Sequence, residues 1–130
     1  MKIKRVINIE DTILKHVAIK RELVSEGIQQ IVLADNAEKG LEEIERAEAA
    51  DEPYDLLVCD MHFNFFGKDD PEAGEKTLKI LREKGIKLPV IFCSSQNWQI
   101  SGSIGTVFYN EHRYWEQDMR EMIKKVEAIL

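Results

Sequence analysis

Acidic and hydroxyl side chains stand directly after short apolar runs in this sequence of 130 residues. They are Glu10 and Asp11 after the run 5–9, Asp60 after the run 56–59, and Ser94 after the run 90–93. If the runs are parallel strands, their carboxyl ends meet at one edge of a sheet, where open α/β sheets bind their ligands. Like charges about 5 Å apart repel by roughly 3 kcal/mol at an effective dielectric constant of about 20. Such a cluster indicates a cation site, and its carboxylate oxygens suit Mg²⁺.

Each acid also has a purely structural explanation. Glu10 and Asp11 could begin the helix expected after them and complement its dipole. Asp60 could be an ordinary turn residue at the end of a strand. The coincidence of acids after two separate runs with a hydroxyl after a third favours the cation site.

The elements that must position these residues alternate along the chain. Apolar runs too short for helices and rich in Val, Ile and Leu predict strands at 5–9, 30–34, 56–59, 90–93 and, more weakly, 105–109. Segments of helical character lie between or after them, at 12–26, 36–49, 74–84 and 113–129. This alternation predicts an α/β fold, with helices on both faces of a parallel sheet.

The helical patterns differ in quality. The segment 12–26 has one broad apolar face, interrupted by Arg21 and made of Ile13, Leu14, Val17, Ala18 and Val24. The segment 96–103 is short and contains Gly and Ser. We therefore expect a fourth crossover helix of a turn or two at most.

Composition narrows the class of protein. A chain that is 44% hydrophobic and 32% charged, with 7 Gly and 3 Pro, is neither collagenous nor disordered. Its net charge of −6 argues against nucleic acid and anionic membrane as partners. The N-terminus lacks the apolar stretch of a signal peptide. Cys59 and Cys93 each lie in an apolar run, which indicates buried, reduced thiols and a cytoplasmic protein.

Three segments together resemble the receiver domains of two-component response regulators. Residues 6–11 are similar to the first strand and acidic pair of that family, and residues 54–61 to its phosphoacceptor strand. Residues 88–95 are similar to its fourth strand with the switch hydroxyl. The resemblance implies one receiver domain over 1–130, with a flavodoxin-like, doubly wound sheet of strand order 2-1-3-4-5 and a shortened fourth helix.

The resemblance also implies roles for individual residues. Asp60 would accept a phosphoryl group from a histidine kinase or phosphotransfer protein. Glu10 and Asp11 would hold Mg²⁺ together with Asp60 and the backbone carbonyl of His62. Ser94 would hydrogen-bond the phosphoryl group and signal to a downstream protein through the fourth strand, the fifth strand and the last helix. No enzymatic turnover is implied beyond self-catalysed phosphotransfer and dephosphorylation.

The sequence departs from the family at three places. Asn110 stands where the family has a lysine, and Arg113 or Lys68 could supply the missing cation. Val107 stands at the aromatic switch position, although Phe108 or Tyr109 could serve instead. The loop 61–73 is longer than usual and contains three Phe within 63–66, which could form a lid, dock a partner or pack on the third helix.

Other functions stay open at this point. A degenerate receiver would act as a binding module that needs no phosphorylation. In either case, we expect any output to come from another polypeptide. Haloacid-dehalogenase-type phosphatases need a second acid where this chain has His62. Nucleotide-binding loops are missing, whereas a flavin protein would share the same sheet.

Overall fold

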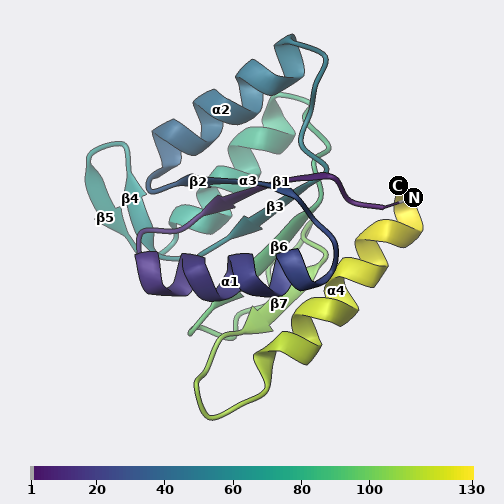
Figure 1. Cartoon of the computed structure of the whole chain (residues 1–130). Coiled ribbons are helices and arrows are strands. Elements are labelled where there is room, and N and C mark those ends of the chain that lie inside the picture. The colour runs from purple at the N-terminus through teal and green to yellow at the C-terminus, as the bar shows by residue number, and fades with distance from the viewer. Residues whose placement is uncertain (1) are drawn as a thin grey trace.

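The computed structural model describes residues 2–130, which form a five-stranded parallel sheet between two layers of helices (Figure 1). Its strands lie in the order β2-β1-β3-β6-β7. Their bounds are β1 Arg5–Ile9, β2 Gln30–Ala34, β3 Leu56–Cys59, β6 Val90–Ser94 and β7 Gly105–Phe108. The helices are α1 Ile13–Ser25, α2 Ala37–Ala49, α3 Ala73–Glu83 and α4 Trp115–Ile129. The expected α/β sheet and its strand order are confirmed.

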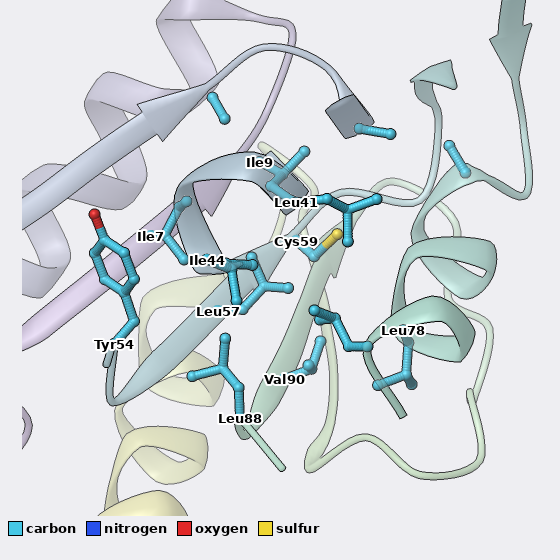
Figure 2. Packing of buried hydrophobic residues seen from close by; sticks show 14 of the residues in the cluster. Ile7, Ile9, Leu41, Ile44, Tyr54, Leu57, Cys59, Leu78, Leu88 and Val90 are labelled. Atoms are coloured by element: carbon cyan, nitrogen blue, oxygen red, sulfur yellow. The ribbon is translucent and has the colours of Figure 1, made fainter. Parts of the chain in front are cut away.

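Each face of the sheet has its own hydrophobic core. Ile7, Ile9 and Leu57 point from the sheet toward Leu41 and Ile44 of α2 (Figure 2). On the opposite face, Val6, Leu56 and Val58 pack with buried residues of α1 and α4. Because the central strands are covered on both faces, they read as continuous apolar runs, as buried parallel strands do.

The register of the sheet brings the strand ends together. Ile9 of β1 lies beside Ala34 and Cys59, and Cys59 lies beside Phe92 of β6. The residues that follow β1 and β3 therefore emerge at the same edge.

Helix α1 buries a different face from the apolar one in its sequence. Leu14 is 81% exposed, and Ile13, Val17 and Val24 are exposed as well. The buried positions are Lys15, Ile19, Glu22 and Leu23. The apolar pattern is misleading here because two of the four buried side chains are charged and have partners inside the fold.

No helix connects β6 to β7 within the described chain, so the shortening of the fourth helix is complete. Residues 95–104 are irregular, with bends at 95–96 and 103–104 and a turn at 101–102, where Gly102 has a φ of 90°. The Thr106 hydroxyl donates a hydrogen bond of 2.6 Å to the Trp98 carbonyl and ties this connection to β7. The ten residues of this connection are at the lower limit of about 10–12 for a crossover that includes a helix.

The long loop after β3 forms a β-hairpin that the sequence pattern did not indicate. Strands β4 (Phe63–Phe65) and β5 (Lys68–Asp70) are antiparallel, and Phe66 and Gly67 form the turn with φ of 51° and 92°. Phe63 is fully buried in the core beneath α2 and α3, and Phe65 packs against that core. Phe66 is 58% exposed at the tip. Core packing therefore accounts for two of the three Phe residues.

None of the helices within residues 2–130 is both long enough and apolar enough to cross a membrane.

Candidate functional site

Three carboxylates meet at the carboxyl end of β1 and β3. One ligand oxygen from each of Glu10, Asp11 and Asp60 can be chosen so that all three lie within 4.8 Å of one another. Glu10 is buried and Asp11 is exposed. The expected cluster is therefore present, with one acid inside the fold and another open to solvent.

A lysine that the sequence analysis missed lies inside this cluster. The Lys15 ammonium is 3.0 Å from Glu10 Oε1 and 3.1 Å from Asp60 Oδ1. It also donates a hydrogen bond of 2.6 Å to the backbone oxygen of Cys93. The available signal was the spacing of Lys15, Ile19 and Leu23, four residues apart on one helical face.

Burial and charge shift the pKa values of this cluster in opposing ways. Burial raises the pKa of Glu10 to about 7; the Lys15 ammonium opposes this rise and the Asp60 charge adds to it. Burial alone would lower the pKa of Lys15, but the charges of Asp60 and Glu10 help to hold it above its ordinary value. Lys15 is therefore an ammonium at neutral pH.

The donor set fits a hard divalent cation. Within the described residues, Glu10 Oε1 is buried and accepts no hydrogen bond of ordinary geometry, although the Lys15 ammonium is near it. Asp11 presents its carboxylate to solvent, which leaves space for metal-bound water. Mg²⁺ prefers one or a few carboxylates together with several waters, so Glu10, Asp11 and Asp60 suit it.

Backbone contacts fix Asp60 at the end of β3. The Asp60 N–H donates to the Ile9 carbonyl at 3.0 Å, and the Met61 N–H donates to Asp60 Oδ1 at 2.8 Å. Gly74 at the start of α3 lies so close that a Cβ there would collide with the Asp60 carbonyl and the Phe92 ring. Helix α3 can therefore approach the end of β3 this closely only with glycine at this position.

Ser94 ends β6 at the same edge of the sheet. It is buried, and its hydroxyl oxygen accepts a hydrogen bond of 3.0 Å from the Gln96 N–H. Ser94 follows Cys93, whose carbonyl binds the Lys15 ammonium. The predicted switch hydroxyl thus belongs to the residue that follows the carbonyl partner of Lys15.

Asn110 does not take part in the cluster through any recorded hydrogen bond of residues 2–130. Its side-chain oxygen instead accepts from the His112 N–H at 2.9 Å, within its own loop. The residue of this region next to the cluster is Tyr109, whose ring centroid lies 5.3 Å from Lys15 Nζ. The assignment of Asn110 to the site therefore stays a prediction.

The two alternative cations proposed from the sequence lie elsewhere. Arg113 pairs with Asp118 at 3.0 Å, and Lys68 is exposed on β5. The His62 side chain is also exposed and lies 2.7 Å from Asp69, which agrees with an ordinary loop histidine. The cation that contacts the acids is Lys15.

Both cysteines are free and buried, as expected. Burial raises the pKa of the Cys93 thiol to about 12 and that of Cys59 well above its ordinary value. Since the thiolate is the nucleophile and the metal ligand, neither side chain is poised for such chemistry.

Comparison with known proteins finds solved structures with a similar fold, but no match by sequence to a family model or a curated protein. Among solved structures, the receiver domain of Francisella response regulator 1452 is 21% identical, with a TM-score of 0.74 over 98% of this chain and 99% of that one. Response regulator TrrA of Thermotoga maritima, in complex with Mg²⁺-BeF, is 20% identical, with a TM-score of 0.71 over 95% and 98%.

A third similar structure is the receiver domain of sensor histidine kinase PA1611 from Pseudomonas aeruginosa, which has a magnesium ion in its active-site cleft. It is 16% identical, with a TM-score of 0.67 over 95% of this chain and 98% of that one. The matches span nearly the whole of each chain. The chain therefore has the fold of the response regulator receiver domains.

Proposed function

We propose that this chain is a receiver that accepts a phosphoryl group on Asp60 from a histidine kinase or a phosphotransfer protein. The observation that carries the proposal is the convergence of Glu10, Asp11 and Asp60 within 4.8 Å at the carboxyl end of a receiver-type sheet. Three carboxylates this close together repel one another and destabilise the fold unless a cation offsets their charge. Phosphoryl transfer to a carboxylate requires such a cation near the phosphoryl oxygens.

The chemistry at Asp60 is an in-line displacement. A carboxylate oxygen of Asp60 forms a bond to phosphorus while the bond from phosphorus to the donor's imidazole nitrogen breaks. The imidazole keeps that electron pair and takes a proton from solvent. The fold contributes mainly by position, because Met61 N–H and Lys15 hold Asp60 Oδ1 and leave Oδ2 for attack.

Mg²⁺ bound to Glu10, Asp11 and Asp60 would offset charge on the phosphoryl oxygens. The backbone carbonyl of His62, two residues after the acceptor, is the fourth protein ligand that we propose. The chain catalyses at most its own phosphorylation and dephosphorylation.

We place the output at the face made by β6, β7 and α4. Ser94 ends β6, and the Tyr109 ring after β7 packs at 5.0 Å from the Trp115 ring of α4. A hydrogen bond from Ser94 to a phosphoryl group would change the packing between these elements. A downstream protein would recognise that change in a cytoplasmic signalling pathway.

The test is to incubate the full chain with Mg²⁺ and acetyl phosphate, and separately with Mg²⁺ and beryllofluoride. We expect a mass increase of one phosphoryl group, which Asp60→Asn abolishes. We also expect amide shifts at Ser94 and Tyr109 on addition of beryllofluoride. A folded wild-type protein that shows neither the adduct nor the shifts would refute phosphoacceptance.

A degenerate receiver is the second candidate, and one observation favours it. The Lys15 ammonium already lies between Glu10 and Asp60, so the acids have a counter-charge without metal or phosphate. Such a protein would bind its partner without switching between unphosphorylated and phosphorylated states. The same incubation distinguishes the two candidates, because a degenerate receiver gives no adduct.

A further inference from the structure

The Lys15 side chain is buried to an extent unusual for lysine, with 9% of its surface exposed. Lysines are almost never buried unless they are paired. Here the ammonium has three hydrogens and three close acceptors: Glu10 Oε1, Asp60 Oδ1 and the Cys93 carbonyl. The ammonium therefore donates a hydrogen bond to the Cys93 carbonyl and lies within ion-pair distance of two carboxylates of the candidate site.

These contacts join three strands at the edge where the chemistry is proposed. Glu10 follows β1, Asp60 follows β3, and Cys93 lies near the end of β6 beside Ser94. Lys15 itself comes from α1, and the ring of Tyr109 flanks its ammonium. The side chain thus lies between the acceptor carboxylate and the strand that carries the switch hydroxyl.

Formal charges show why the pocket needs this ammonium. Glu10, Asp11 and Asp60 together carry three negative charges when ionised, and Lys15 leaves a balance of two. One divalent cation would neutralise the two negative charges that remain. Among the described residues, the ion-pair contacts to these acids come from Lys15, while Arg113 pairs with Asp118.

We infer that Lys15 is the phosphoryl-contacting cation of this pocket and acts from α1 rather than from the end of β7. Before transfer, its ammonium holds Asp60 Oδ1. After transfer, it donates a hydrogen bond to a phosphoryl oxygen while it keeps the Cys93 carbonyl as an anchor. The nitrogen stays protonated throughout and forms no covalent bond. This inference rests on the proposed phosphoacceptor function.

The test compares Lys15→Met with Lys20→Met, a matched change at an exposed lysine of the same helix. Two affinities are measured: Mg²⁺ alone, from the amide shift of Asp11, and beryllofluoride in saturating Mg²⁺, from ¹⁹F spectra. Methionine fills similar space without charge. We expect Lys15→Met to weaken beryllofluoride binding by roughly tenfold or more, the loss of one charge-assisted hydrogen bond.

The affinity for Mg²⁺ separates an electrostatic role from a structural one. Removing a positive charge next to the acids should leave Mg²⁺ affinity unchanged or increase it, whereas a damaged pocket would weaken both ligands. Lys20→Met should alter neither affinity. A Lys15→Met protein that binds beryllofluoride as wild type does, or that weakens both ligands in parallel, would overturn the inference.

A wild-type measurement covers the case in which Lys15→Met fails to fold. The ¹⁵N signal of the buried Lys15 ammonium should shift when beryllofluoride is added, and an unmoved signal in a protein that binds the ligand would overturn the assignment. If wild-type protein binds no beryllofluoride, the proposed function fails and the role of Lys15 fails with it. If wild type binds and only the Lys15 result is negative, the proposed function stands.

Discussion

Glu43 on α2 is an acid whose charged form the fold stabilises. Arg46 donates hydrogen bonds of 2.9 and 2.6 Å to its two oxygens, and the Tyr54 hydroxyl donates another of 2.6 Å. The bonds from Arg46 and then Tyr54 lower the pKa of Glu43 to about 2. Burial and the bond to Glu43 raise the pKa of Tyr54 to about 12. The network links α2 to the segment that leads into β3.

Glu43→Gln should therefore destabilise the protein in a pH-dependent way. The stabilisation from a lowered pKa is present above the ordinary value of 4.5 and is lost as pH falls toward 2. Because the Glu43 side chain is 26% exposed, we expect a loss of only about 1 kcal/mol at pH 7. Urea unfolding at pH 7, 4 and 2.5 measures it. Glu42→Gln, at an exposed neighbour, is the control, and a pH-independent loss would contradict the argument.

Some residues of the site could be predicted from the sequence and others could not. Glu10, Asp11 and Asp60 were predictable because each follows an apolar run that could be read as a strand. Lys15 was not, because a lone lysine in a helix is ordinarily at the surface. Its burial depends on carboxylates 5 and 45 positions away and on a carbonyl 78 positions away, and only the assembled sheet brings these together.

At the scale of elements, α1 has two charged residues on its buried face. Lys15 binds the acidic cluster, and Glu22 accepts a hydrogen bond of 2.6 Å from Arg120 of α4. Ile19 and Leu23 are buried on the same face of the helix as Lys15 and Glu22. The more conspicuous apolar residues consequently face outward.

Paired substitutions on α1 test this orientation. Leu23→Ala removes a fully buried side chain and should cost about 2–4 kcal/mol in the free energy of unfolding. Leu14→Ala, at a side chain that is 81% exposed, should change stability by less than about 0.5 kcal/mol. Chemical denaturation measures both variants. The reverse ranking would mean that the helix buries its apolar face after all.

The elements themselves were predictable to different degrees. All five strands of the main sheet begin where the apolar runs predict, and their ends differ by one residue at most. The hairpin was missed because its strands have three residues each, too few for an alternating pattern. Helix α2 was clear because Asn36 caps it by accepting a hydrogen bond of 2.9 Å from the Lys39 N–H.

At the scale of the whole molecule, the candidate metal site couples ligand binding to stability. A ligand that binds only the folded chain stabilises it by about 2.7 kcal/mol at a free concentration 100 times its Kd. We therefore expect Mg²⁺ to raise the melting temperature and a chelator to reverse the rise.

Asp11→Asn provides the control for this effect. Asp11 is exposed, and its one recorded side-chain contact within the described chain is a 3.5 Å hydrogen bond from the Thr12 hydroxyl. The variant should keep the fold and respond much less to Mg²⁺. If Asp11→Asn and wild type gain the same melting temperature, the metal binds elsewhere.

The position of Lys15 also has a consequence for the order in which the protein is made. Lys15 and Glu10 are synthesised within five residues of each other, but Asp60 follows much later and the Cys93 carbonyl later still. The ammonium can acquire its third partner only after the chain has been made through β6. A nascent chain that stops short of β6 therefore has the acids but lacks the anchored cation, so the pocket is completed late during translation.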